Sequence, residues 1–163
     1  TVTLKDELDY VQKYLYCMKV RYQSSLNYSI DVDERLLSQP VPKLIIQPIV
    51  ENAIRYGSDC APPWNISVTS VVTHGSWQIE VSDTGPGFTE EAKERITANI
   101  MKAIQNPGLP ELKINGLGTV NVYLRWKIFC KGDIIFRYGN NADGHGVVSI
   151  GRYFQNKEDT ETV

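Results

Sequence analysis

The sequence has no excess of basic residues and no long hydrophobic run. Its 163 residues include 17 Lys and Arg against 19 Asp and Glu, which gives a formal net charge of −2. Domains that bind nucleic acid carry a basic surface, so this balance argues against such a partner. The segment "LIIQPIV" at 44–50 is far shorter than the roughly 20 apolar residues of a transmembrane helix. No signal-peptide pattern opens the sequence either.

Cysteines are few, and two common nucleotide-binding motifs are missing. Cys17, Cys60 and Cys130 are odd in number and form no CxxC pair, so we expect reduced packing thiols in a cytosolic domain. No GxxxxGK[ST] pattern is present, which excludes a P-loop. Gly116 and Gly118 do not continue into GxGxxG, because residue 121 is Asn. A Rossmann-type site is therefore not indicated.

Length and composition predict one globular domain. Hydrophobic residues make up 42% of the sequence and charged residues 22%, an ordinary balance for a chain that folds around a single core. We assign residues 1–155 to this domain. The last eight residues, "NKEDTETV" at 156–163, are predicted to be a flexible tail.

The hydrophobic pattern predicts alternating helices and strands. Helices are expected at 3–22, 43–56, 89–104 and 119–130, and the first should begin with a capping box of Thr3 and Asp6. Strands are expected at 26–32, 132–139 and 145–154, with a hairpin over 65–83 that turns near Gly75. This order predicts an α/β two-layer sandwich. Its sheet is mixed and largely antiparallel, and about three main helices cover one face.

A carboxylate follows the second strand of the predicted hairpin, in "SDTGPGF" at 82–88. Asp83 could accept a hydrogen bond from the amino group of an adenine, and Gly85 and Gly87 would let a flat ring lie against bare backbone. The alternative is a simple turn in which Asp83 caps its own backbone.

The predicted helix at 43–56 is apolar around most of its circumference, so its polar residues need an explanation. Asn52 is costly to bury unless it is paired, and its amide oxygen is a suitable ligand for Mg²⁺. The alternative is a core Asn that bonds to backbone. Arg55, one turn later, could reach phosphate oxygens or could simply face solvent.

Two glycines precede the predicted helix at 119–130, in "INGLGTVNVYLRW". At Gly116 and Gly118 the free N–H groups of the helix start and the helix dipole favour an anion, and glycine permits close approach of a phosphate. The alternative is a tight turn without a ligand.

Taken in order, the three motifs resemble the boxes of the GHKL superfamily of ATP-binding domains, which share the Bergerat fold. "IVENAIRYG" resembles the N box, "DTGPGF" the G1 box and "NGLGTVN" the G2 box. With "LKDELDYVQKYLYCMKVRY" upstream, "PKLIIQPIVENAIRYG" resembles the LytS/YesM-type sensor histidine kinases in particular. The resemblance extends from Thr3 to about Phe154.

The resemblance implies a Mg-ATP site. Asn52 would hold the Mg²⁺ that bridges the ATP phosphates, and Asp83 would recognise the adenine. Segment 89–115 would form the lid over the nucleotide. The implied ATP-binding residues are Asn52, Arg55, Tyr56, Asp83, Gly85, Gly87, Phe88, Gly116, Leu117, Gly118 and Thr119.

The implied activity is that of a protein-histidine kinase, with Asn52 and Glu51 as candidate catalytic residues. Hydrolytic relatives place a carboxylate one helical turn before the Mg²⁺-binding Asn, but here that residue is Pro48. Glu51 points about 100° away from Asn52 around the helix. Transfer to a histidine is therefore favoured over attack by water. A hydrolytic GHKL-type ATPase and a non-catalytic nucleotide-binding or partner-binding module are the alternatives.

The acceptor histidine is expected outside this segment. His74 and His145 are predicted to be solvent-facing loop residues, and neither lies in a sequence resembling a phosphoacceptor box. The resemblance implies an upstream helical domain for dimerisation and phosphate acceptance, and a response regulator that interacts with the full-length kinase. The segment would be a cytoplasmic domain of a membrane-anchored protein, with membrane contact only through segments outside it.

Overall fold

The structure is a computed structural model that describes residues 1–105 and 117–154. Its main feature is a five-stranded sheet in the order β2-β4-β5-β7-β6, in which β2 and β4 are parallel and the other pairs are antiparallel. This confirms the predicted mixed, largely antiparallel sheet. A small sheet of β1 and β3 lies beside it. The strands are β1 (Val2–Thr3), β2 (Leu26–Asp31), β3 (Pro40–Val41), β4 (Trp64–Val72), β5 (Ser76–Ser82), β6 (Ile134–Asn140) and β7 (Gly146–Tyr153).

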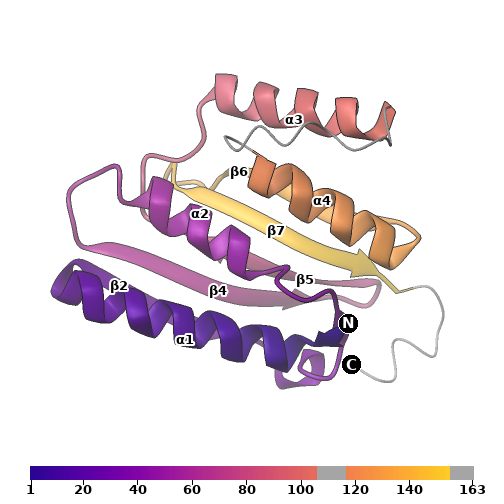
Figure 1. The fold of residues 1–163 in the computed structure, drawn as a ribbon, viewed down its shortest axis with the longest axis horizontal. Coiled ribbons are helices and arrows are strands. Elements are labelled where there is room, and N and C mark those ends of the chain that lie inside the picture. The colour runs from indigo at the N-terminus through magenta and orange to yellow at the C-terminus, as the bar shows by residue number, and fades with distance from the viewer. Residues whose placement is uncertain (106–116, 155–163) are drawn as a thin grey trace.

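Helices cover one face of the large sheet, as Figure 1 shows. In this view α1, α2 and α4 lie in front of the strands, and α3 lies beyond α4. Ile96 and Ile100 of α3 pack against Val120 of α4 in a small cluster of their own. The helices are α1 (Leu4–Tyr22), α2 (Gln47–Gly57), α3 (Glu90–Gln105) and α4 (Leu117–Cys130), with short 3-10 helices η1 (Gln23–Ser25) and η2 (Glu34–Leu36).

The start of α1 follows from its sequence. The N–H of Asp6 donates to Thr3 Oγ1 at 3.2 Å, and the N–H of Thr3 donates to Asp6 Oδ2 at 2.9 Å. This is the predicted capping box, in which each side chain satisfies a backbone group of the other residue. Leu8, Val11 and Leu15 then face the sheet and are buried.

The start of α2 differs from the prediction. The helix begins at Gln47, four residues later than expected from the apolar pattern, and Pro48 lies in its first turn. Leu44 has φ of +53°, a left-handed conformation that cannot continue into a right-handed helix. Residues 43–46 therefore form a separate turn before α2.

Two tryptophans join α4 to the sheet. The rings of Trp77 on β5 and Trp126 on α4 meet edge to face with centroids 5.9 Å apart, and both side chains are buried. The indole N–H of Trp126 donates to the carbonyl of Gly151 on β7 at 2.7 Å. These contacts fix the C-terminal half of α4 against the neighbouring strands β5 and β7.

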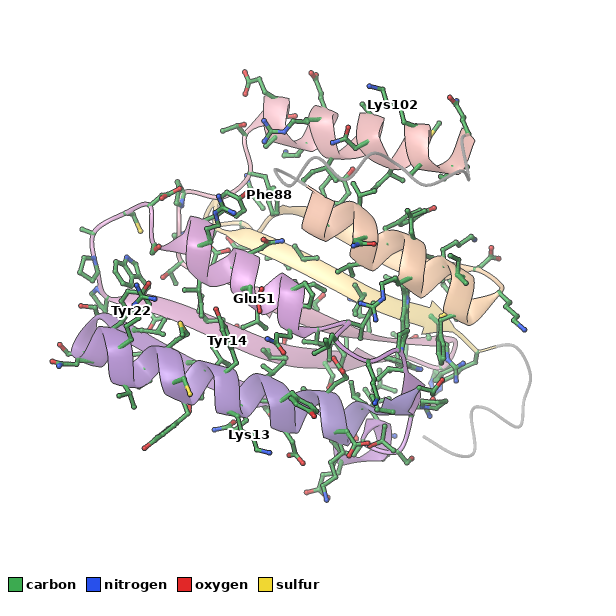
Figure 2. The ribbon with its side chains drawn as sticks, viewed as in Figure 1. Lys13, Tyr14, Tyr22, Glu51, Phe88 and Lys102 are labelled. Carbon is green, nitrogen blue, oxygen red and sulfur yellow. The ribbon has the colours of Figure 1, made fainter. Side chains whose placement is uncertain are left out.

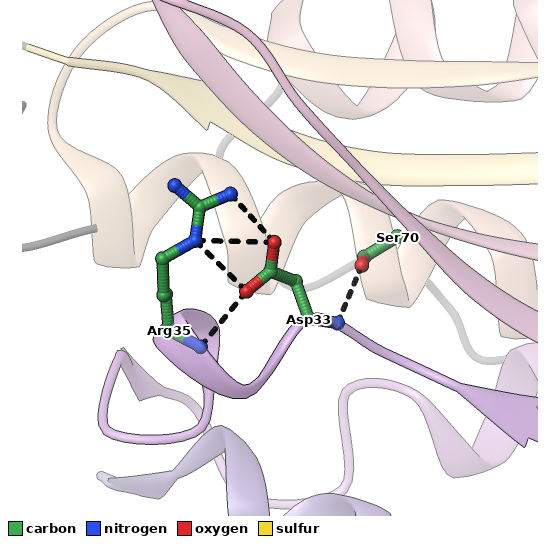
Figure 3. A network of polar contacts seen from close by, with 3 residues as sticks. All are labelled: Asp33, Arg35 and Ser70. Atoms are coloured by element: carbon green, nitrogen blue, oxygen red, sulfur yellow. Dashed lines mark hydrogen bonds and ion pairs between the residues drawn. The ribbon is translucent and has the colours of Figure 1, made fainter.

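A polar network shapes the connection after the edge strand β2 (Figure 3). The carboxylate of Asp33 accepts the N–H of Arg35 at 3.0 Å and pairs with its guanidinium at 2.6 Å. The N–H of Asp33 donates to Ser70 Oγ on β4 at 2.8 Å. Exposed pairs of this kind add little stability. The contact with Ser70 nevertheless fixes the end of this strand to β4 before the chain enters η2.

Two expectations about exposure need separate comment. The three cysteines are free, but Cys17 and Cys60 are exposed rather than packed, and only Cys130 is half-buried. The prediction of packing thiols was therefore wrong for two of them. Among the helices in residues 1–105 and 117–154, none has the length and apolar character needed to cross a bilayer.

Candidate nucleotide-binding site

A cavity of about 440 Å³ lies between the helices and the helix-covered face of the sheet. Its volume is within the range of about 300–1,000 Å³ that is typical of small-molecule sites. Asn52 from α2 and Asp83 from the end of β5 both line it, although 31 positions separate them in the sequence. The predicted ATP-binding residues in its wall are Asn52, Arg55, Tyr56, Asp83, Gly87, Phe88, Gly118 and Thr119.

Asp83 is held by backbone groups on both sides. Its N–H donates to the carbonyl of Gly146 at 3.1 Å, and its Oδ1 accepts the N–H of Gly85 at 2.8 Å. Among the described residues, no side chain donates to the carboxylate. The carboxylate can therefore accept a further hydrogen bond in the cavity that Asp83 lines.

Glycines surround this carboxylate at distances that exclude larger residues. A Cβ at Gly57 would lie 2.9 Å from Asp83 Cβ, and one at Gly146 would lie 2.7 Å from Oδ2. A Cβ at Gly85 would lie 2.5 Å from the Cα of Gly57. Gly85 does not line the cavity itself. It instead allows the end of α2 and the turn after β5 to approach one another.

The environment of Asp83 disfavours its charge. Burial raises the pKa of the Asp83 carboxyl, and the N–H groups of Gly85 and Gly146 and the nearby His145 only partly oppose this rise. The expectation that His145 faces solvent was wrong. Its ring is half-buried, and Nδ1 lies 2.7 Å from the carbonyl oxygen of Gly85, so this nitrogen carries the proton and donates.

Asp83→Asn should stabilise the fold without nucleotide at neutral pH. The raised pKa of Asp83 means that its contribution favours folding below the unfolded pKa near 3.8 and is lost as the pH rises through the folded pKa. Asn carries no charge and can still accept the N–H of Gly85. We therefore expect a higher Tm than wild type at pH 7, with the difference vanishing as the pH falls below 3.8. Thermal unfolding followed by circular dichroism across this range measures it, and an equal difference at every pH would contradict the assignment.

Asn52 meets the beginning of α4 at another part of the cavity wall. A Cβ at Gly118 would lie 3.3 Å from Asn52 Nδ2, so the backbone of α4 passes close to this amide. Thr119 follows in the cavity wall. The first turn of a 14-residue helix thus offers its free N–H groups and its positive dipole end beside Asn52.

The turn after Asp83 is fixed by a residue of β6. Gly87 has φ of +75°, and a Cβ there would lie 2.6 Å from Asn140 Oδ1, so only glycine fits. The Asn140 side chain accepts the N–H of Phe88 at 2.7 Å and donates to its carbonyl at 3.0 Å. Phe88 is thereby held in the cavity wall, next to Tyr138.

Comparison with known families decides the identity of the fold. Residues 38–152 match the family described as "Histidine kinase-, DNA gyrase B-, and HSP90-like ATPase". The chain belongs to this family. It is an ATP-binding catalytic domain of the sensor histidine kinase type, as the sequence predicted.

Curated relatives and solved structures agree with this assignment. An uncharacterized sensor-like histidine kinase of Staphylococcus epidermidis is 28% identical over 134 residues, which are 80% of this chain and 26% of the relative. The sensor histidine kinase YpdA of Escherichia coli is 33% identical over 128 residues, 78% and 20% of the two chains. YesM of Bacillus subtilis is 33% identical over 88 residues, 53% and 15%. The chain thus spans about a quarter or less of the length of these relatives.

Two solved domains share the fold. The catalytic domain of the histidine kinase ThkA gives a TM-score of 0.58 at 19% identity and covers 90% of this chain and 94% of that one. The mycobacterial sensor histidine kinase MprB gives 0.57 at 14% identity, with 93% and 96% covered.

Two candidate residues of this ATPase-family domain differ in their relation to the cavity. Arg55 lines it, with its guanidinium carbon 5.5 Å from the centroid of the Tyr56 ring. Glu51 is exposed and does not line it, and its Oε1 accepts the amide of Gln47 at 2.9 Å. Figure 2 shows Glu51 on α2 next to Tyr14 on α1. Burial raises the pKa of the Tyr14 phenol, and the charge of Glu51 adds to this effect.

Parts of the predicted G2 box and lid lie outside the description. Gly116 and residues 106–115 of the expected lid are not among the described residues, and of Leu117 only its place at the start of α4 is described. The described part of the segment expected to be the lid forms the predicted helix, capped by Thr89, whose Oγ1 accepts the N–H of Ala92 at 3.1 Å.

Several wall residues escaped the sequence interpretation. Arg95 and Asn99 of α3 line the cavity, and so does Gly146 at the start of β7. The helical spacing of Arg95 and Asn99, four residues apart, could have indicated that α3 has one polar face toward a site. The roles of Gly57 and Asn140 beside the wall could not be predicted, because each depends on contacts with segments distant in sequence.

The donors in the described residues suit a metal ion bound together with a nucleotide rather than an independent one. No group of three or more His, Cys, Asp or Glu within residues 1–105 and 117–154 could hold a metal. The amide oxygen of Asn52 is one hard ligand of the kind that Mg²⁺ accepts when phosphates and water supply the others.

Proposed function

We propose that this domain binds Mg-ATP in the 440 Å³ cavity and supplies the γ-phosphoryl group to a histidine on a helical segment outside it. The observation that carries the proposal is the shared cavity of Asp83 and Asn52, an acid and an amide on different elements. It brings an acceptor for an adenine amine and a ligand for a phosphate-bound cation into one cavity.

The adenine is assigned to the Asp83 end. Asp83 Oδ2 would accept a hydrogen bond from the exocyclic amine, and Gly57 and Gly146 leave the space beside the carboxylate free of side chains. Phe88 and Tyr56 contribute aromatic side chains to the wall of the same cavity. Because Asp83 is partly removed from water, a hydrogen bond donated by the ligand is stronger there than it would be in water.

The phosphates are assigned to the Asn52 end. Along α2, Asn52 lies five residues before Gly57, which corresponds to about 7 Å of helix axis. A triphosphate that extends this far from the adenine would reach the first turn of α4, where free N–H groups favour an anion. Mg²⁺ would lie between Asn52 and the phosphates and neutralise charge during transfer.

A histidine acceptor is favoured over water because no carboxylate in the described residues is placed as a base beside Asn52. The carboxylates in the described wall are Asp59 and Asp83; Asp59 lies seven residues after Asn52, beyond the end of α2, and Asp83 is assigned to the adenine. Glu51 bonds to Gln47 outside the wall, and Pro48 occupies the position one turn earlier. A nucleophile supplied by another segment does not need such a base in this domain, which disfavours a hydrolytic ATPase.

The longer protein is proposed to be a membrane-anchored sensor kinase, with this domain in the cytoplasm. An upstream helical domain would provide dimerisation and the acceptor histidine, in the same chain or its partner, and a response regulator would receive the phosphoryl group. These proposals rest on the sensor histidine kinases among the relatives.

The proposal is tested by phosphoryl transfer in a reconstituted mixture. The chain is incubated with Mg²⁺ and γ-labelled ATP, together with the helical acceptor segment of the same protein. We expect acid-labile, alkali-stable label on that segment, and none when its histidine is replaced by Gln. Steady phosphate release by the chain alone, with no label on the acceptor, would instead identify a hydrolytic ATPase.

A further inference from the structure

A buried carboxylate from α1 holds the turn that precedes α2. Glu7 is 1% exposed, and its Oε1 accepts the N–H of Leu44 at 2.5 Å. Its Oε2 accepts the N–H of Ile45 at 2.9 Å and that of Ile46 at 3.3 Å. A buried charge is costly unless several donors satisfy it, and these backbone groups do so. Ile46 is the N-cap residue of α2, so Glu7 holds the turn that leads directly into this helix, near the positive end of its dipole.

A cation from α4 holds the other side of the same turn. Arg125 Nη1 donates to the carbonyl of Leu44 at 3.0 Å, and its Nη2 donates to the carbonyl of Lys43. The N–H groups of the turn thus bond to α1 and its carbonyl groups bond to α4. Leu44 has a left-handed φ of +53°. In this conformation its N–H bonds to Glu7 while its carbonyl bonds to Arg125.

These contacts link α2 to α4 at a point away from the cavity. Nearer the cavity the two helices meet again, where a Cβ on Gly118 would come within 3.3 Å of the Asn52 amide. Arg125 lies seven residues after Gly118, about two helical turns, so the same face of α4 makes both contacts. The turn at 43–46 therefore contributes to the spacing between Asn52 and the first turn of α4.

The beginning of α1 is part of the same unit. The N–H of Leu4 donates to the carbonyl of Gln39 at 2.8 Å, and the N–H of Lys5 donates to that of Leu37 at 3.0 Å. Strand β1 pairs with β3 just before the turn. A change in the direction of α1 would accordingly act on the start of α2.

We propose that Glu7 and Arg125 are positioning residues for the phosphate end of the cavity. They hold the turn at 43–46 so that Asn52 and the start of α4 keep the spacing that Mg-ATP requires, and they make that spacing depend on the orientation of α1. Neither side chain lines the cavity, so neither touches the nucleotide. This inference rests on the proposed function of the cavity.

The test compares Glu7→Gln and Arg125→Met with wild type in the 163-residue chain. Titration calorimetry with Mg-ATP should give a Kd at least about fivefold higher for each variant, and the double variant should lose less than the two losses combined, because both act on one turn. The NMR resonance of the Asn52 side-chain amide should shift in both variants without nucleotide. Arg125→Lys should recover only part of the affinity, since an ammonium lacks the planar fork of donors.

Matched controls separate positioning from general stability. Asp9→Asn removes another acid of α1, which is exposed, and Lys127→Met removes a cation of α4 that bonds to the carbonyl of Gly132 at 2.9 Å. Lys127→Met should lower Tm, and both controls should leave the Kd and the Asn52 resonance unchanged. If Glu7→Gln does not fold, Arg125→Met carries the test, because the Arg125 side chain is half-exposed.

Failure of the positioning role and failure of the proposed Mg-ATP site give different results. Should Glu7→Gln or Arg125→Met lower Tm as Lys127→Met does while the Kd and the Asn52 resonance stay at wild-type values, the positioning role is refuted. A wild-type chain that does not bind Mg-ATP refutes the proposed function instead. The Asn52 resonance would still report on whether Glu7 and Arg125 position that amide.

Discussion

Asp83→Ala should greatly weaken the binding of adenine nucleotides and leave the fold intact. The variant loses the only carboxylate assigned to the base. A hydrogen bond to a charged group contributes about 1.5–3 kcal/mol, which corresponds to roughly a 10- to 150-fold change in Kd. The N–H of Gly85 also loses its acceptor, at 2.8 Å in the structure, so the turn that leads to Phe88 is less well held. Calorimetric titration with Mg-ATP, together with Tm, measures both effects.

The neighbouring acid Asp143 provides a matched control. It is exposed on the loop between β6 and β7 and lies outside the wall of the 440 Å³ cavity. Asp143→Ala should therefore bind Mg-ATP as wild type does. An unchanged Kd in Asp83→Ala would remove the adenine assignment and, with it, the orientation proposed for the whole nucleotide.

Much of the fold could be predicted because the deciding interactions are local. The capping box of Thr3 and Asp6 involves residues three apart, and the alternation that places Trp77, Ile79 and Val81 toward the core is visible in β5 itself. The three boxes could likewise be recognised from short segments. That the three boxes line one cavity was expected only from the resemblance. A short sequence pattern does not indicate which loops lie close together in the fold.

The features that the sequence did not reveal depend on contacts between distant segments. The start of α2 was placed too early because an apolar run cannot indicate the left-handed φ of Leu44. That conformation accompanies the contacts with Glu7 and Arg125, which come from positions 37 and 81 residues away. His145 was placed in solvent for the same reason, because its partner is the carbonyl of Gly85 on another loop.

Asn52→Ala should produce a different defect from Asp83→Ala. The amide is assigned to the metal and the phosphates, so Mg²⁺ should no longer improve the affinity for ATP, whereas contacts with the adenine persist. Transfer to the acceptor histidine should fall by roughly 100-fold or more, since losing one group that stabilises developing charge typically costs about 10²–10³ in rate. Titrations with ATP in Mg²⁺ and in EDTA, and single-turnover labelling of the acceptor, measure the two effects.

Asn121→Ala is the control for this variant, because Asn121 carries the same side-chain amide on the G2 segment but is exposed on α4 and does not line the cavity. It should retain the Mg²⁺ dependence and the transfer rate of wild type. If Asn52→Ala keeps both as well, the amide does not hold the cation. The close approach of Gly118, where a Cβ would lie 3.3 Å from Asn52 Nδ2, would then reflect helix packing alone.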